Sequence, residues 1–548
     1  MVSPENNIPK LRLDSEYKTI ARNTFYSIVN TYGLFILSVF TSYFIARIIS
    51  QEEWGILIIA NSIILILITL SNFIPPGLIF AMNFYVPRYR AKKNINKLRS
   101  FIFKGAYLRI FSIFVFTLIG FLIFFVFNSF FNIYLGNHPN LLYLLLPLIP
   151  ILSFETFIAT IFVGFNLFKF YTVTLVLKTI TNLSPLLWFF YGGVTVQIEH
   201  LAIINLLTAL FPLIFEILII ILKFPKRASE SGERLTFKIF LKKVLKYGSF
   251  LRIQGLLGEI FVQSQTQAIG IYENPEWVTG NSVSKTYTAT SGMFLNSLNG
   301  SLLYSFSSID YKKEYESLTR VFNNILIYTI YIFLMISGIL FLFSEFFLGL
   351  IFGDDYVQFS ILIKLILIGN TISIYGSLYI ILLRTTYRIK QQIILIIIAF
   401  PLQVIVFFIG IINFGLVGFL FLDIIHRAIW LVVFLVASIK IMKVNVKFLK
   451  VFSLYLTFFL SLFLSIILGD LFLNNISYQF WQLLNFILID RLNFLTILIF
   501  LILFIGLNIL IKTFTKKDLE SIEFLFSKDT RSNRFIKRFL KFLKRFLR

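Results

Sequence analysis

Long apolar blocks separated by short polar connections make up most of this chain. Runs such as residues 56–70 and 141–152 continue into segments of about 20 or more residues with few charges, a length that matches the hydrocarbon thickness of a bilayer. In lipid, only helices and closed barrels satisfy the backbone polar groups. The blocks lack the roughly ten-residue alternation of barrel strands. The pattern therefore predicts an all-α polytopic membrane protein.

The blocks divide into about 14 transmembrane helices, each with roughly 20–28 residues. The predicted spans are residues 24–49, 54–83, 101–130, 140–166, 171–191, 200–223, 245–272, 279–305, 319–347, 357–384, 391–413, 414–441, 447–471 and 492–513. No block between them is large enough for a separate soluble domain.

Cations occur in every second connection. The loops after predicted spans 2, 4, 6, 8, 10 and 12 carry Lys or Arg, whereas the intervening loops are nearly free of them, apart from Arg491. Basic loops stay on the cytoplasmic side. We therefore predict a multi-pass protein of the plasma (cytoplasmic) membrane with both termini in the cytoplasm.

Composition supports the membrane class and narrows the chemistry. Hydrophobic residues make up 58% and charged residues 14%, against about 45–50% and 25% in soluble domains. The net charge of +24 resides in short loops, so anionic lipid explains it better than nucleic acid, for which we expect no binding. With no Cys and three His, we predict no metal site, no cofactor and no catalytic residue, and we expect a monomer.

A short motif occurs twice and indicates an internal repeat. Glu53-Trp54-Gly55 precedes the second span, and Glu276-Trp277 with Gly280 precedes the eighth. Two equivalent halves of six helices plus two extra helices form a common transporter plan. The predicted parts are a cytoplasmic segment 1–23, an N-lobe 24–223, a basic linker 224–244, a C-lobe 245–441, two further helices within 442–513, and a tail 514–548.

The tail has its own pattern. From Arg534 onward, pairs of apolar residues recur every three or four positions, with Lys or Arg between them. That spacing predicts a cationic amphipathic helix bound to the anionic lipids of the cytoplasmic leaflet. A docking site for a partner is the alternative.

Polar residues inside the predicted spans indicate an aqueous cavity. Glu259 and Gln263 lie four apart on one helix face, and Arg252 lies on nearly the same face. Ionisable groups in a span need a partner or water, and cations with amides suit a diphosphate and sugar hydroxyls. Polar contacts between helices are the alternative explanation. The predicted cavity residues are Arg22, Asn30, Arg252, Glu259, Gln263 and Lys285.

Other charged residues favour structural pairing. Glu155, Lys178 and Glu216 fall at similar depth in three neighbouring spans, which predicts a buried pair or triad. Asp423 and Arg427 are four apart and are predicted to pair along one helix. Because His titrates near physiological pH, Asp423 and His426 are also candidates for ion coupling.

Several stretches resemble one transporter family. They are the helix start at Asn23, Ala46-Arg47 through Glu53-Trp54-Gly55, Pro76-Gly77 ending in Arg88, and residues 164–170, 350–356 and 413–418. Their order, from about residue 18 to about residue 525, resembles the oligosaccharide flippases of the polysaccharide-biosynthesis family. That family lies within the multidrug/oligosaccharidyl-lipid/polysaccharide exporter (MOP) superfamily. The chain departs from it at Ser307-Ser308, where relatives often have proline.

The resemblance implies two six-helix lobes in a V, with helices one, two, seven and eight lining a central cavity. It implies alternating access that moves a polyprenyl-(di)phosphate-linked oligosaccharide from the cytoplasmic to the outer leaflet, with Arg22 and Arg252 at the phosphates. An ion-coupled multidrug exporter of the same superfamily and a passive scramblase remain alternatives. A membrane glycosyltransferase or polymerase is disfavoured because the outer loops lack an acidic or Arg/His cluster.

Overall fold

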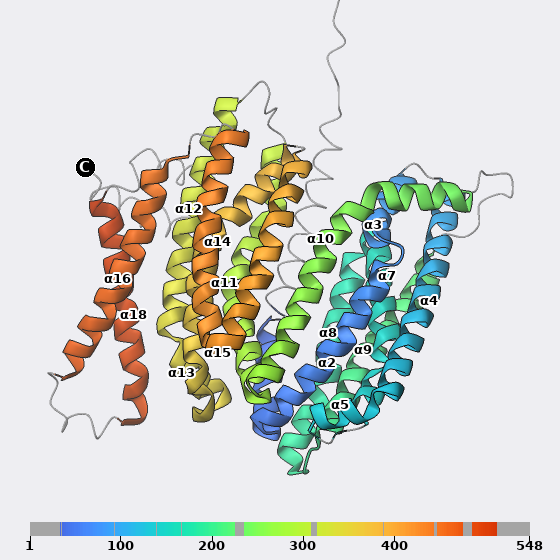
Figure 1. Cartoon of the computed structure of the whole chain (residues 1–548), viewed down its shortest axis with the longest axis horizontal. Coiled ribbons are helices and arrows are strands. Elements are labelled where there is room, and N and C mark those ends of the chain that lie inside the picture. The colour runs from blue at the N-terminus through green and yellow to red at the C-terminus, as the bar shows by residue number, and fades with distance from the viewer. Residues whose placement is uncertain are drawn as a thin grey trace, which may run out of the picture. The chain divides into compact units, whose positions relative to one another are not determined.

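The computed structural model describes residues 33, 35–91, 94–136, 138, 140–165, 167–224, 235–307, 315–386, 388–442, 446–474 and 485–511. Every regular element in these ranges is helical, which confirms the predicted all-α fold (Figure 1). The chain divides into two compact units, residues 1–280 and 281–548. Each unit is described separately below.

The first unit, residues 1–280, contains the helices from Phe35 to Tyr272. After a helix at Phe35–Ile48, they are α2 (Gln51–Phe73), α3 (Leu78–Ala91), α4 (Ile95–Val126), α5 (Asn128–Tyr134), α6 (Leu141–Leu145), α7 (Leu148–Gly164), α8 (Phe168–Gly192), α9 (Ile198–Lys223) and α10 (Phe237–Tyr272). The next helix, α11 (Pro275–Ser307), begins in this unit and continues into the second.

The second unit contains the remaining helices. They are α12 (Tyr315–Leu342), α13 (Ser344–Phe352), the 3-10 helix η1 (Asp354–Phe359), α14 (Ser360–Thr385), α15 (Ile389–Met442), α16 (Phe448–Asn474) and α18 (Asn485–Leu510). Within the described residues, nine helical segments are long and apolar enough to cross a membrane. The chain is therefore a multi-pass membrane protein, and each predicted span overlaps a described helix.

The second predicted span is wrong as a single helix. Residues 54–83 are divided between α2 and α3, because Pro75 and Pro76 lack the N–H groups that a continuing helix needs. Gly77 adopts a φ of 83°, a left-handed conformation that favours glycine. The break leaves carbonyl oxygens at the end of α2 without helical partners.

The long element α15 is two helices joined by a tight turn. A straight helix of 54 residues would be about 80 Å long, more than twice the thickness of a bilayer core. Gly415 interrupts it with φ 69° and ψ −172°. A Cβ atom on Gly410 would lie 2.6 Å from the Cα of Phe419, so the two arms meet beside the turn. This agrees with the predicted boundary at residues 413–414.

The predicted linker 224–244 is partly helical. Thr236 caps α10 by accepting a hydrogen bond from the backbone N–H of Ile239 (3.4 Å), so the first two turns of α10 lie inside the predicted linker. The boundary between the two units falls at Gly280, because α10 packs on α2 and α3. In the structure α10 belongs to the first compact unit, and the predicted division into an N-lobe and a C-lobe stays a prediction.

Both copies of the Glu-Trp motif lie in the first turns of helices, and these turns are in contact. Ser50 forms a capping box with Glu53 at the start of α2, and the Asn274 side chain accepts from the Trp277 N–H (3.0 Å) at the start of α11. The Thr279 hydroxyl donates to the Gln51 carbonyl (2.8 Å). A Cβ on Gly55 would lie 1.8 Å from the carbonyl oxygen of Pro275, so this approach requires glycine.

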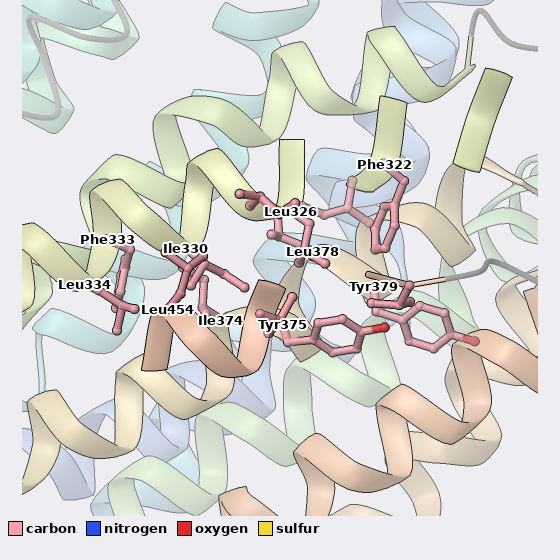
Figure 2. Packing of buried hydrophobic residues seen from close by; sticks show 14 of the residues in the cluster. Phe322, Leu326, Ile330, Phe333, Leu334, Ile374, Tyr375, Leu378, Tyr379 and Leu454 are labelled. Atoms are coloured by element: carbon pink, nitrogen blue, oxygen red, sulfur yellow. The ribbon is translucent and has the colours of Figure 1, made fainter. Parts of the chain in front are cut away.

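The core of the second unit joins α12, α14, α15, α16 and α18. Figure 2 shows α12 residues such as Phe322, Leu326 and Ile330 packed against Ile374, Tyr375 and Leu378 of α14. The Tyr375 hydroxyl donates a hydrogen bond to Ser438 Oγ (2.7 Å).

In the first unit, α4 exposes large apolar side chains, with Phe114 at 66% and Phe125 at 67%, as expected for a helix facing lipid.

Candidate functional site

The predicted cavity residues of α10 form an ion pair along that helix. Arg252 Nη1 donates to Glu259 Oε1 (2.8 Å) and Nη2 to Oε2 (2.9 Å), a two-pronged arrangement. The side chains are seven residues apart, and Gly255 lies on the stretch of helix between them. A Cβ there would lie 3.5 Å from Arg252 Nη1, an ordinary van der Waals contact, so the ion pair passes directly over this residue.

The two partners of this pair differ in exposure. The Arg252 side chain is 9% exposed, whereas that of Glu259 is 45% exposed. Arg252 Nε is buried and has no hydrogen-bond partner among the described residues. The Glu259 carboxylate is hydrated and the guanidinium has an unused donor. Arg252 is therefore able to exchange this carboxylate for another anion that accepts two hydrogen bonds side by side, such as a phosphate.

The face of α10 that carries Arg252, Glu259 and Gln263 continues to Gln267, and the role of Gln267 differs from that of the ion pair. Gln263 is partly buried. One turn further, the Gln267 amide donates to the Ile59 carbonyl of α2 (2.9 Å) and to the Ser62 hydroxyl. Gln267 Oε1 accepts from the Tyr134 hydroxyl of α5 (2.9 Å). Burial raises the pKa of Tyr134 to about 12, which keeps that hydroxyl protonated. Gln267 therefore makes polar contacts between helices, which is the alternative explanation given above for the polar residues inside the predicted spans.

Arg109 of α4 is a buried cation that was not among the predicted site residues. It is 1% exposed, and its Nη1 donates to the Ser71 carbonyl (2.9 Å) at the broken end of α2. Its Nε and Nη2 donate to the Ser153 carbonyl of α7 (3.0 and 2.7 Å), and Nη2 also reaches Thr156 Oγ1 (3.1 Å). Arg109 and Arg252 repel each other electrostatically.

This arginine could have been found from two signals in the sequence. It is the only charged residue between Lys104 and Glu155, and an arginine inside an apolar span requires partners. The Pro75-Pro76 pair removes the N–H group that would serve the Ser71 carbonyl. An unsatisfied carbonyl and a lone cation at membrane depth together predict a contact.

The predicted acidic group in the first unit forms as expected. Lys178 Nζ of α8 lies 3.0 and 3.1 Å from the two carboxylate oxygens of Glu155 on α7. Glu216 of α9 is 1% exposed and interacts electrostatically with both partners. Glu155 and Lys178 therefore form the predicted pair, and Glu216 influences them electrostatically, with no hydrogen-bond partner for its Oε2 among the described residues.

In the second unit, residues that the sequence assigned to two separate sites interact. Asp423 Oδ2 accepts from Arg427 Nε (2.6 Å), as the four-residue spacing predicts. Arg427 Nη1 also donates to Asn370 Oδ1 (3.1 Å) and Ser373 Oγ (3.0 Å) of α14, where Gly369 leaves room for its side chain. Lys285 of α11 interacts electrostatically with both Asp423 and Arg427.

One face of α15 carries buried polar atoms that lack partners among the described residues. They are Asp423 Oδ1, both ring nitrogens of His426 and Trp430 Nε1. Buried polar groups normally have hydrogen bonds, so water or a bound solute is expected here. No group of three or more His, Cys, Asp or Glu able to hold a metal is present in the described part of the chain.

Two predicted cavity residues, Arg22 and Asn30, lie outside the described residues, as does the predicted tail helix from Arg534. Whether the six predicted cavity residues share one cavity stays a prediction. What the structure brings together is Arg252 with Glu259 in the first unit, and Lys285 with Asp423 in the second.

No family model and no curated protein matches the sequence. Solved structures with a similar fold include the lipid II flippase MurJ in an inward closed conformation. Its TM-score is 0.59 at 17% identity, covering 88% of this chain and 98% of MurJ. An inward-facing multidrug resistance MATE transporter of the MOP superfamily has a TM-score of 0.58 at 13% identity, covering 75% and 95%.

A Vibrio cholerae MATE transporter matches at a TM-score of 0.53 and 12% identity, covering 78% of this chain and 98% of its own. At these identities the likeness concerns the fold. The chain has the helical membrane fold that is found in MATE transporters and in MurJ. The match to MurJ extends over a larger share of this chain than the two MATE matches do.

Proposed function

We propose that this protein is a flippase that moves a polyprenyl-(di)phosphate-linked oligosaccharide from the cytoplasmic to the outer leaflet, for the assembly of a cell-surface glycan. The observation that carries this proposal is how the buried Arg252 guanidinium is hydrogen-bonded. It makes two hydrogen bonds to one exposed carboxylate, that of Glu259, and its Nε has no partner among the described residues. A diphosphate presents the same pair of acceptor oxygens with more charge.

In this mechanism Glu259 occupies the phosphate position when substrate is absent. The carboxylate holds the guanidinium extended along α10, so little side-chain entropy is lost when the phosphate replaces it. The displaced carboxylate is 45% exposed in the pair and stays hydrated when it is released. Alternating access then carries the lipid-linked sugar across the membrane, with both chain termini in the cytoplasm.

The structural likeness supports a lipid-linked substrate. MurJ is described as a lipid II flippase, and its match covers 88% of this chain, against 75% and 78% for the two MATE transporters. The chain also has helices α16 and α18 beyond α15, in line with the predicted two additional helices.

An ion-coupled exporter of small cationic compounds is the second candidate. Asp423 favours it, because this carboxylate is buried and its Oδ1 has no partner among the described residues. The MATE likeness points the same way. Such an exporter would need Asp423 for transport and would be indifferent to Arg252.

A proteoliposome assay separates these functions. A labelled polyprenyl-diphosphate oligosaccharide is placed in one leaflet, and its arrival in the other is followed by access to an added glycosidase. We expect the wild-type protein to transfer it and Arg252→Gln to lower the rate at least tenfold. Lys246→Gln removes an exposed cation from the same helix and is expected to transfer normally.

The exchanged pair Arg252→Glu/Glu259→Arg makes the test specific. It keeps an ion pair on α10 but moves the cation two turns along the helix. If the pair only stabilises α10, the exchange restores transfer; if Arg252 binds phosphate, transfer stays low. Full transfer by well-folded Arg252→Gln, or none by the wild type alongside export of cationic dyes, would favour the second candidate.

A further inference from the structure

A cavity of about 430 Å³ opens at one end of the first unit, within the range of roughly 300–1,000 Å³ typical of ligand sites. Four segments at the ends of helices surround it: the last turn of α3, the first turn of α4, the turn between α7 and α8, and the end of α9. Its lining includes Tyr89, Arg90, Ile95, Leu98, Phe165 and Lys223.

The walls of this cavity are mostly apolar, and its charges are all positive. Arg90 and Lys223 line it, and no acidic residue does. Arg90 is placed over the ring of Phe165 (5.7 Å from the guanidinium carbon to the ring centroid). Among the described residues, no carboxylate pairs with either cation. The sequence itself has no acidic residue between Glu53 and Glu155.

A third cation lies behind the wall. Lys243 Nζ of α10 donates to the Tyr89 hydroxyl (2.5 Å) and lies over the Tyr89 ring at 5.2 Å. Because the phenol oxygen accepts this bond, its own hydrogen is left to donate to another acceptor. The cavity therefore combines two full positive charges and a polarised hydroxyl with an apolar interior.

We propose that this cavity binds the phosphate headgroup of an anionic membrane phospholipid, with the glycerol and upper acyl chains against its apolar walls. The cations attract a phosphate, and the walls of Ile95, Leu98 and Phe165 favour an amphiphile over a free ion. The three connections that meet here all belong to the basic set predicted to face the cytoplasm, the leaflet in which anionic lipids gather. The proposal does not depend on what the protein transports.

The test is a lipid titration of the purified full chain in detergent, followed by native mass spectrometry. The two probes are phosphatidylglycerol and phosphatidylcholine with identical acyl chains. The wild type is expected to bind phosphatidylglycerol more tightly. Arg90→Gln and Lys223→Gln are each expected to weaken that binding about fivefold, and the double variant more than tenfold.

The control variants separate a built site from general surface charge. Arg88→Gln removes an exposed arginine that lies over Phe84 at the same 5.7 Å on the same helix, outside the cavity. Lys440→Gln removes an exposed lysine from the last turn of α15. The double control is expected to keep the preference. An equal loss in both double variants would assign the binding to diffuse charge and overturn the proposal.

A filling variant tests the cavity without changing charge. Ile95→Trp introduces a bulky side chain at a half-buried position and is expected to abolish the preference while the protein elutes as a single species. Unchanged lipid binding by Ile95→Trp would place the lipid elsewhere. Inorganic phosphate is titrated in parallel: if it displaces phosphatidylglycerol completely at millimolar concentration, the site recognises soluble phosphate, and the lipid assignment fails.

Discussion

Arg109 and Arg252 are two arginines of the same unit that are almost equally buried, and they are satisfied in opposite ways. Arg109 makes four hydrogen bonds to two carbonyls and a hydroxyl and none to a carboxylate. Arg252 is bonded to one half-exposed carboxylate and retains an unpartnered Nε. The first has no acceptor that a solute could replace, whereas the second has one. The partners of a buried charge therefore separate a structural arginine from a candidate binding one.

The strongest way to break this comparison is Arg109→Leu. Loss of the guanidinium removes four buried hydrogen bonds from a charged donor, although the Ser71 carbonyl keeps the Ser112 hydroxyl (2.7 Å) and the Ser153 carbonyl keeps the Thr156 hydroxyl (2.8 Å) as donors. A hydrogen bond to a charged group contributes about 1.5–3 kcal/mol, so we expect the free energy of unfolding to fall by about 3 kcal/mol or more. The unfolding midpoint in detergent and the yield of monodisperse protein measure this. Arg109→Lys, which retains one charged donor group, should lose less. Wild-type stability in Arg109→Leu would refute a structural role.

Asp423→Asn should have an intermediate effect. Arg427 keeps Asn370 and Ser373 as partners but loses its counter-ion, and Lys285 loses the electrostatic attraction of Asp423. We expect a loss of about 1–3 kcal/mol in the free energy of unfolding, measured in the same detergent assay. Asp423→Glu keeps the charge and serves as the control. A loss as large for Asp423→Glu would indicate packing rather than charge as the cause.

Arg252→Gln should have the smallest effect on stability. The carboxylate that it leaves behind is 45% exposed and stays hydrated, so we expect a change of about 1 kcal/mol or less. The unfolding midpoint is compared with that of Glu259→Gln, which should lose more stability because it leaves the buried Arg252 without its counter-ion. A loss approaching that of Arg109→Leu would mean that Arg252 is structural too, and the proposed phosphate site would fail with it.

Hydropathy and charge alternation were enough to locate the helices, because a membrane span is defined by length and apolarity. The errors fall where local backbone chemistry decides. Pro75-Pro76 divides a span that is apolar throughout, and Thr236 starts α10 inside a lysine-rich segment that hydropathy assigns to a loop. Both signals are present in the sequence, as a missing N–H and as a cap, but neither changes the mean hydropathy.

The candidate site was predictable only where partners lie close in sequence or at equal depth. The spacing of Asp423 and Arg427 predicts their bond, and the similar depth of Glu155 and Lys178 predicts theirs. The interaction of Lys285 with Asp423 joins helices nearly 140 residues apart, and no periodicity encodes such a pairing. The bond of Gln267 to α2 likewise depends on which helix α10 packs against.

The turn at Gly415 has a consequence for how the chain enters a membrane. The arms of α15 meet directly beside it, since Gly410 lies against Phe419, and no polar loop separates them. One arm therefore cannot enter the lipid while the other arm remains in the aqueous phase. The two arms must leave the translocation machinery together as one helical hairpin, whose free energy of partitioning is that of both arms combined. A charge placed at residue 415 would then hinder the insertion of two spans at once.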